Sequence, residues 1–214
     1  MSEFNSLEEE KKFYHNACMP EGEMGRQILD RMNIGHGPLV DWGMKILDGV
    51  SAQKLLDIGC GGGRNTVAMM KRFPDAHMTA VDYSETSVRQ TTEYAADEIS
   101  KGLCDVLYAN VTGLPFDDAS FDLASGFETV YFWPGPVESL REVCRVLKPG
   151  GKLFLVNEAD GFDEEGKKFE TIIDEMTAYT IEQLSKALTE AGFSSVKSIH
   201  HPDMPWIALL AEKL

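Results

Sequence analysis

Residues 55–65 read Leu55-Leu56-Asp57-Ile58-Gly59-Cys60-Gly61-Gly62-Gly63-Arg64-Asn65, and this stretch decides the fold. Apolar residues typical of a buried strand lead directly into four glycines, and a helical pattern begins near Asn65. Glycine has no Cβ, so the chain can turn sharply here and leave its backbone open to close approach. The stretch therefore predicts a strand, a tight turn and a helix in immediate succession.

The spacing of these glycines separates two kinds of ligand-binding loop. A dinucleotide-binding loop has the pattern G-x-G-x-x-G, which would require glycine at the position of Arg64. Instead, Asp57 stands two residues before Gly59, and Gly61 and Gly63 follow at alternate positions. This arrangement resembles motif I of the class I methyltransferases that depend on S-adenosylmethionine (SAM). For the loop taken alone, a purely structural turn between strand and helix is the alternative.

Strand and helix signals alternate along the rest of the chain, which is typical of an α/β fold. We expect strands at 53–58, 77–82, 104–109, 121–125, 152–156, 196–200 and 206–211, and helices at 64–73, 84–100, 137–147 and 180–192. This order predicts a doubly wound, mostly parallel, seven-stranded sheet of Rossmann-like form. The last two strands follow each other without a helix, so one antiparallel strand is expected near the C-terminus. Residues 159–178 are charged and less regular, and one surface helix is expected there.

The first 50 residues precede the sheet and carry two amphipathic patterns. Apolar residues recur at helical spacing in two sets, Met24-Ile28-Met32 and Leu39-Trp42-Ile46-Leu47. The segment between the sets holds two glycines and a proline and should break the helix. We therefore expect a helical cap or lid at 1–50, forming one compact unit with a methyltransferase domain at 51–214.

Composition restricts the classes of function. The chain has 214 residues, 43% of them hydrophobic, and a formal net charge of -15, which suits one sizeable domain. Lysine and arginine form no cluster, so nucleic acid is not expected as a partner. No apolar run approaches the roughly 20 residues of a membrane span, and residues 1–4 do not begin a secretory signal. Four scattered cysteines without a C-x-x-C pair favour a cytoplasmic protein without disulfides or a zinc site.

Two further segments resemble the same family. Residues 109–123 read Ala109-Asn110-Val111-Thr112-Gly113-Leu114-Pro115-Phe116-Asp117-Asp118-Ala119-Ser120-Phe121-Asp122-Leu123, similar to the family's loose signature G-D-A-x-x-L-P-F-x-D-x-S-F-D. Residues 140–151 match L-R-E-x-x-R-V-L-K-P-G-G almost residue for residue. The matched segments occur in the family's order over about 53–156. The resemblance implies a SAM-dependent methyltransferase, similar to the small-molecule branch that includes the ubiquinone and menaquinone biosynthetic methyltransferases.

The resemblance also implies which residues hold SAM. They are Asp57, Gly59, Cys60, Gly61, Asp82, Tyr83, Asn110, Val111 and Phe127. In this family the acid at Asp57 organises the turn and faces the methionine amino group, directly or through water. A carboxylate at Asp82 can accept both ribose hydroxyls, although NAD enzymes also use this position and a helix cap is its structural alternative. Asn110 stands where the family more often has aspartate, so adenine recognition would survive in a weaker form.

The segment after the strand at 121–125 should face the reacting methyl group. Glu128 and His36 are the candidate catalytic residues; Glu128 could act as a general base, bind a cationic substrate, or be a solvated loop residue. The candidate contacts to the acceptor are Tyr131, Trp133, Met24, Trp42 and Asn157, and the aromatic ones could instead pack in the core. No metal is expected, because no cluster has metal-ligand spacing and adjacent residues such as His200-His201 point to opposite faces of a strand.

Three hypotheses about function remain. The first is a SAM-dependent methyltransferase that acts on a small-molecule acceptor, for which a homodimer is one conceivable assembly. The second is a non-catalytic SAM-binding protein; the departure at Asn110 favours it, and the intact acids Asp57 and Asp82 oppose it. The third is an NAD(P)-dependent oxidoreductase, which Arg64 in place of the third glycine opposes.

Overall fold

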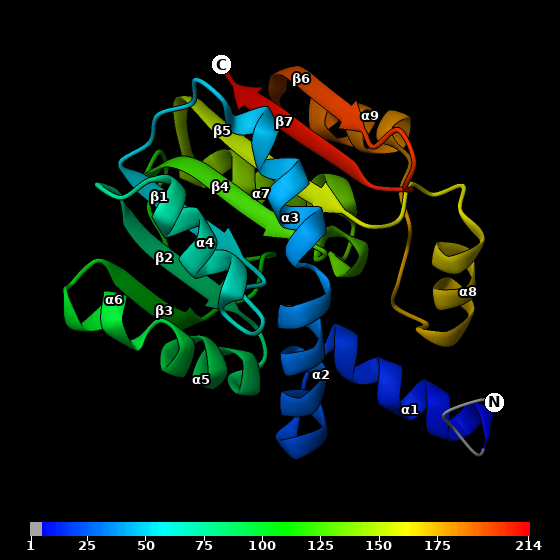
Figure 1. Cartoon of the computed structure of the whole chain (residues 1–214). Helices are drawn as coiled ribbons and strands as arrows, with labels where there is room; N and C mark the ends of the chain where they lie inside the picture. The colour runs from blue at the N-terminus through cyan, green and yellow to red at the C-terminus, as the bar shows by residue number, and fades with distance from the viewer. Residues whose placement is uncertain (1–5) are drawn as a thin grey trace.

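A seven-stranded sheet runs through the molecule in the order β3-β2-β1-β4-β5-β7-β6 (Figure 1). The computed structural model describes residues 6–214, so the expectation about residues 1–4 lies outside the described residues. The strands are β1 (Lys54–Ile58), β2 (His77–Asp82), β3 (Cys104–Tyr108), β4 (Phe121–Phe127), β5 (Leu147–Asn157), β6 (Phe193–His200) and β7 (Ile207–Lys213). Neighbouring strands are parallel except at β7, which is antiparallel to both β5 and β6. The predicted doubly wound sheet with one antiparallel strand is confirmed.

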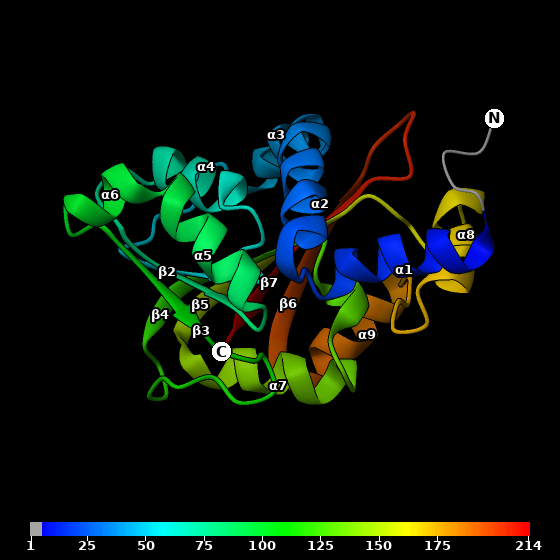
Figure 2. The same ribbon diagram turned by 90° about the horizontal axis from the view of Figure 1, so that it is seen from below.

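Helices cover both faces of the sheet, as Figure 2 shows. The helices are α1 (Leu7–Cys18), α2 (Gly22–Gly35), α3 (Gly37–Gly43), α4 (Arg64–Arg72), α5 (Glu85–Tyr94), α6 (Ala96–Ser100), α7 (Pro136–Val146), α8 (Glu164–Ile172) and α9 (Ile181–Ala191), with 3-10 turns η1 (Met44–Leu47) and η2 (Val130–Phe132). One layer contains α3 to α6, and the opposite layer contains α7 and α9. Among the helices of residues 6–214, none has the length and apolar character needed to cross a bilayer.

Each layer of helices buries its own apolar core against the sheet. Leu56 and Leu153 belong to the core on the side of α7 and α9, whereas Leu55 and Phe154 belong to the core on the other side. Consecutive strand residues therefore serve opposite cores, because side chains along a strand alternate between its two faces. Burial on both faces explains why these strands read as continuous apolar runs in the sequence.

Of the N-terminal helices, α1 and α2 lie beyond the carboxyl ends of the parallel strands, whereas α3 lies over a face of the sheet and contacts β5 (Figure 1). α1 packs against α8, where Tyr14 and Phe169 meet edge to face with their ring centroids 5.1 Å apart. His36 alone separates α2 from α3, so the helix break expected from glycine and proline is confined to one residue. The second amphipathic set is divided between α3 and η1. α1 and α2 thus cover the edge of the sheet at which ligands bind in doubly wound folds.

Four strands, β4 to β7, are longer than the sequence predicts, because pairing with their neighbours extends them. β4 continues to Phe127, which pairs with Val156 of β5. β5 begins at Leu147, which pairs with Phe121, so the residues between the expected helix at 137–147 and the expected strand at 152–156 belong to the strand. The single helix expected before β3 is divided into α5 and α6.

Arg145 on α7 holds the segment between β3 and β4 against the sheet. Its guanidinium donates to the carbonyl oxygens of Leu114 and Phe116 at 3.1 and 2.8 Å. It also pairs with Asp118 and with Glu142, each at 2.7 Å. One planar group thus satisfies two main-chain acceptors and two carboxylates, an arrangement suited to the fixed fork of donors in arginine.

We expect Arg145→Ala to lower the free energy of unfolding by about 1–3 kcal/mol, because it leaves these acceptors without their donor. Urea denaturation at pH 7 measures the change. Arg141→Ala is the matched control on the same helix, since Arg141 makes a single 3.5 Å contact to the carbonyl oxygen of Glu190. Its cost should stay within about 0.5 kcal/mol. Equal costs for the two variants would contradict a structural role for the Arg145 network.

Candidate active site

The glycine turn lies at the carboxyl end of β1, immediately before α4. The N–H groups of Gly59 and Cys60 donate to the carbonyl oxygen of Val81 in β2, at 2.8 and 3.0 Å. Gly59 has a φ of +76°, and a Cβ built there would lie 2.3 Å from Cγ2 of Thr129. The turn is therefore held tightly between β2 and the segment after β4, in a conformation that favours glycine.

Asp82 ends β2 beside this turn. Its carboxylate accepts the N–H of Gly61 at 3.0 Å and the N–H of Ser84 at 2.9 Å. Burial raises the pKa of Asp82 from its ordinary 3.8 to about 6, although the same two N–H groups oppose the shift. The carboxylate is thus fixed in position and lies on the wall of a cavity.

That cavity has a volume of about 530 Å³ and opens beyond the carboxyl ends of β1, β2 and β4. Eight of the residues expected to hold SAM line it: Gly59, Cys60, Gly61, Asp82, Tyr83, Asn110, Val111 and Phe127. Four of the expected catalytic and acceptor residues line it as well: His36, Glu128, Tyr131 and Trp133. A cavity of this volume suits a ligand of the size of a nucleoside cofactor.

Asp57, expected to organise the turn and to face the methionine amino group directly or through water, does not line the cavity. The side chain is buried behind the glycine turn, where it accepts the hydroxyl of Thr66 at 2.6 Å and that of Ser125 at 2.9 Å. These bonds join β1 to α4 and to β4. Burial raises the pKa of Asp57 from 3.8 to about 6, against the two hydroxyl donors. The acid organises the turn from within the core.

This raised pKa predicts a pH dependence of stability. An acid whose pKa is higher in the folded than in the unfolded state stabilises the fold most when protonated, and that stability is lost as the pH rises towards about 6. Asp57→Asn removes this loss. We therefore expect its free energy of unfolding to improve relative to the parent chain by about 1 kcal/mol between pH 5 and pH 7.5 in urea denaturation.

The control for this pH dependence is Asp122→Asn. Desolvation opposes the shift, but hydrogen bonds from Lys148 and from the N–H groups of Gln53 and Lys54 lower the pKa of Asp122. The stability that ionised Asp122 contributes is lost only as the pH falls below about 4, so Asp122→Asn should be less stable than the parent chain by nearly the same amount at pH 5 and at pH 7.5. If the free energy of unfolding changed equally with pH in both variants, the assignment of a raised pKa to Asp57 and a lowered pKa to Asp122 would be contradicted.

Three residues expected to contact an acceptor lie away from the cavity. Met24 is on the outer part of α2 and 39% exposed. Trp42 packs against His201, with ring centroids 5.4 Å apart, because the β6–β7 loop folds over α3. Asn157 is fully buried inside β5 opposite Ile207 of β7. The alternation of side chains along a strand turns Asn157 into the core and leaves the next residue, Glu158, at the edge.

Asn110 lines the cavity but uses its side-chain oxygen locally. That oxygen accepts the backbone N–H and the hydroxyl of Thr112, both at 3.0 Å. The Asn110 oxygen, which was expected to accept an adenine amino group, is therefore already hydrogen-bonded within its own loop. The neighbouring Val111 is buried and lines the same wall.

A second cavity of about 350 Å³ adjoins the first. Aromatic side chains from distant elements line it: Phe13, Tyr14, Tyr131, Phe132, Phe169 and Trp206. Its acidic residues are Glu128, Glu158, Asp163 and Glu165. The two cavities share Ala17, Met32, His36, Glu128, Tyr131 and Phe132. An apolar ligand in the second cavity would therefore lie next to a ligand in the first.

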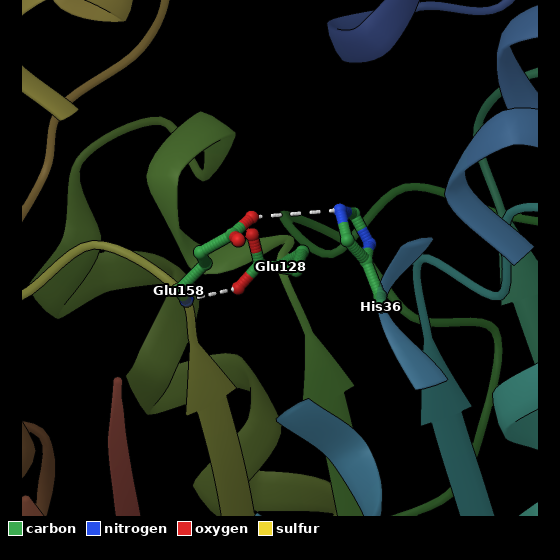
Figure 3. A group of neighbouring side chains, drawn as sticks. All are labelled: His36, Glu128 and Glu158. Atoms are coloured by element: carbon green, nitrogen blue, oxygen red, sulfur yellow. Dashed lines mark hydrogen bonds and ion pairs between the residues drawn. The ribbon is translucent and has the colours of Figure 1, made fainter. Parts of the chain in front are cut away.

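Glu128 stands at this junction, directly after β4. One oxygen of its carboxylate accepts the hydroxyl of Tyr131 at 3.3 Å and the N–H of Glu158. The Tyr131 oxygen in turn accepts the N–H of Ala159 at 2.9 Å. The carboxylate of Glu158 lies 3.7 Å from Nε2 of His36 (Figure 3). Three segments thus meet at one point: the residues after β4, the residues after β5 and the connection between α2 and α3.

At the junction of the two cavities, the surroundings disfavour the charged forms of Glu128, Glu158 and His36. Burial, and then the negative charge of Glu158, raise the pKa of Glu128 well above its ordinary range. Burial, and then Glu165 and Asp163, raise the pKa of Glu158. Burial, and then Arg64, lower the pKa of His36, which favours the neutral imidazole.

The sequence analysis missed the residues by which the N-terminal helices reach the cofactor loops. Nδ2 of Asn33 in α2 donates to the carbonyl oxygen of Gly62 at 2.9 Å. The hydroxyl of Tyr83 donates to the carbonyl oxygen of Cys18 at 2.6 Å. A polar residue on an amphipathic helix and a main-chain carbonyl give no pattern in the sequence, so only the fold reveals these contacts.

Comparisons with known proteins agree with this geometry. A family model described as "Methyltransferase domain" matches residues 56–155. The O-methyltransferase rstn1 of Aspergillus nomiae is 32% identical over 111 residues, which are 52% of this chain and 49% of that protein. The 27-O-demethylrifamycin SV methyltransferase of Amycolatopsis mediterranei is 29% identical over 150 residues, 66% of this chain and 54% of that protein.

A solved SAM-dependent methyltransferase from Aquifex aeolicus has the same fold, with a TM-score of 0.73 and 18% identity over 88% of this chain and 98% of that one. The chain spans about half the length of the two curated relatives. The residues present fit the cofactor of this family, because an open glycine backbone and the buried carboxylate of Asp82 face one cavity of suitable volume. Residues 56–155 therefore match a methyltransferase domain, the chain has the fold of a solved SAM-dependent methyltransferase, and its site suits S-adenosylmethionine as the cofactor.

Proposed function

We propose that this chain transfers the methyl group of SAM, bound in the 530 Å³ cavity, to a small-molecule acceptor bound in the 350 Å³ cavity. The observation that carries the proposal is the meeting of the two cavities at His36, Glu128 and Tyr131. The aromatic lining of the second cavity supports an acceptor with a substantial apolar part. Both curated relatives are named for methylation at oxygen, so hydroxyl acceptors are the first class to examine.

Bound SAM supplies a methyl group that its sulfonium makes electrophilic. The acceptor's lone pair would bond to the methyl carbon as the sulfur–methyl bond breaks, which releases S-adenosylhomocysteine (SAH) and a proton from the acceptor. The chain's own contribution is orientation, since an in-line displacement depends on the alignment of the reacting atoms. Asp82 would accept the ribose hydroxyls, the backbone at Gly59 and Gly61 would border the cofactor, and the N-terminus of α4 would face the methionine carboxylate.

Glu128 is the group proposed to take the acceptor's proton. The hydroxyl of Tyr131 and the N–H of Glu158 hold one carboxylate oxygen, which leaves the other directed into the junction. His36 is proposed to contact the acceptor from the opposite side. Both residues would then touch reacting atoms, whereas Tyr131 would act by positioning Glu128.

Residues 1–50 are proposed to act as a cap on the domain at 51–214. Three hydrogen bonds support this role: Tyr83 to the carbonyl oxygen of Cys18 at 2.6 Å, Ser84 to that of Pro20 at 2.5 Å, and Asn33 to that of Gly62 at 2.9 Å. They join the cap to the loops around the cofactor cavity. Release of SAH would then require at least some of these bonds to open.

Calorimetric titration of the purified chain with SAH, alongside NADH and NADPH, tests the cofactor part of the proposal. Saturable binding of SAH alone is expected, followed by turnover of SAM with hydroxyl acceptors detected as SAH release. Binding of a nicotinamide cofactor in its place would overturn the proposal. Tight SAH binding without turnover of any acceptor class would instead assign the chain to the non-catalytic SAM-binding proteins.

A further inference from the structure

Three side chains from separate parts of the chain converge at the junction of the two cavities. His36 comes from the connection between α2 and α3, Glu128 follows β4, and Glu158 follows β5. One potential ligand atom of each lies within 4.8 Å of the others. Figure 3 shows the imidazole directed toward the two carboxylates. No other group of three such residues with this spacing occurs among residues 6–214.

We propose that His36, Glu128 and Glu158 bind a divalent metal ion. Binding of the ion does not depend on the proposed methyl transfer. Its consequence for the reaction, described below, does rest on that proposal.

Each of the three residues has a ligand atom available. The hydrogen bonds that Glu128 receives end on one oxygen, and its second oxygen points toward Glu158 and His36 (Figure 3). Nε2 of His36 lies 3.7 Å from the nearer Glu158 oxygen, which exceeds hydrogen-bonding distance. Ligands about 2.1 Å from one ion stand roughly 3–3.5 Å apart, so the three ligand atoms, which lie within 4.8 Å of one another, would have to move closer together. The Glu158 side chain is 54% exposed and has room to make that movement.

The charges at the junction favour a cation. Among the described residues, His36 is the ion-pair partner found for Glu158, and none is found for Glu128. Two carboxyl groups and an imidazole thus face one point. A divalent ion there would favour the ionised form of both carboxyl groups.

The donor set indicates the class of metal. Imidazole nitrogen suits Zn²⁺ and other transition metals, and carboxylate oxygens suit Mn²⁺ and Mg²⁺. One nitrogen with two carboxylates is therefore suited to Mn²⁺ or Zn²⁺. Three protein ligands leave coordination positions open, as in catalytic metal sites. An acceptor hydroxyl bound there would lose its proton to solvent water more readily. With the ion bound, Glu128 would act as a ligand, and water would take the role of base proposed for Glu128 without the ion.

The test is titration of the chelator-treated full-length chain with MnCl₂, and separately with ZnCl₂, by calorimetry, with the Mn²⁺ arm repeated by electron paramagnetic resonance. One saturable ion per chain is expected without SAH. His36→Ala and Glu158→Gln should each weaken binding at least about tenfold. Glu128→Gln, of nearly the same shape, should do the same.

His200→Ala is the matched control. It removes a histidine that pairs with a single carboxylate, Asp160, at 2.9 Å and lies outside both cavities. Its metal affinity should equal that of the parent chain. Circular dichroism and thermal unfolding establish that each variant is folded before its titration is interpreted.

Two results would overturn the metal site: no saturable binding of either metal, or equal weakening in His200→Ala and Glu158→Gln. Binding of methylammonium chloride that depends on Glu158, without binding of either metal, would assign the carboxylates to an amine and also overturn it. Titration of the same samples with SAH keeps the two proposals distinct. SAH binding without metal binding would refute the metal site alone, and metal binding without SAH binding would refute the proposed function alone.

Discussion

Asp82→Asn is expected to weaken SAH binding at least about tenfold, with a smaller loss of stability than alanine would cause. An ionised carboxylate can accept both ribose hydroxyls, and each such bond contributes about 1.5–3 kcal/mol. Asparagine has nearly the same shape but carries no charge and offers one acceptor oxygen in place of two. Calorimetry with SAH at pH 7.5 measures the loss, because Asp82 of the parent chain, with a pKa of about 6, is ionised at that pH.

The conservative substitution is preferable to alanine at this position. The Asp82 carboxylate also accepts the N–H groups of Gly61 and Ser84, and alanine would leave both donors unpaired. Asp105→Asn is the control, since Asp105 is exposed on β3 and lies outside both cavities. SAH affinity unchanged in Asp82→Asn would remove Asp82 from the cofactor site.

Gly59→Ala is expected to lower the free energy of unfolding by about 2–5 kcal/mol and to abolish measurable SAH binding. About 1–2 kcal/mol of this comes from placing a Cβ at a φ of +76°. The remainder comes from the collision with Thr129, whose Cγ2 would lie 2.3 Å from the new atom. Relief of that contact would displace the turn or the segment that carries Glu128, and both border the cofactor cavity.

Gly150→Ala separates the two causes. Gly150 in β5 has the same φ of +76°, and a Cβ there would meet no atom within 4 Å. It should cost only about 1–2 kcal/mol, from the backbone conformation, and leave SAH binding intact. Urea denaturation and calorimetry measure both variants. If both substitutions lower the free energy of unfolding equally, the close contact between Gly59 and Thr129 contributes nothing to the cost of Gly59→Ala.

The sheet was predictable because its signals are local. Consecutive apolar residues such as Leu55 and Leu56 pack in cores on opposite faces of the sheet. A strand buried on both sides can therefore be predicted from a short run of apolar residues. Helix signals recur between the strands, and two consecutive strands at the end require one antiparallel neighbour. The errors lie at strand ends, where Leu147 and Phe127 are held by pairing with residues distant in the sequence.

The cofactor side of the site was also largely predictable. The glycine turn and Asp82 follow directly from β1 and β2, and parallel strands bring their carboxyl ends to the same edge of the sheet. Asp57 shows the limit of this reasoning, because the residue is part of the motif but its side chain turns into the core towards Thr66 and Ser125.

The sequence by itself determined the α/β fold, the mostly parallel sheet with one antiparallel strand, and the loops that border the cofactor, since these depend on residues that are neighbours along the chain. Tertiary structure alone decided the second cavity and the junction of His36, Glu128 and Glu158. Those three residues follow different elements and share no spacing. They meet because helices beyond the sheet edge fold back over the carboxyl ends of β4 and β5, and packing between distant segments leaves no local pattern.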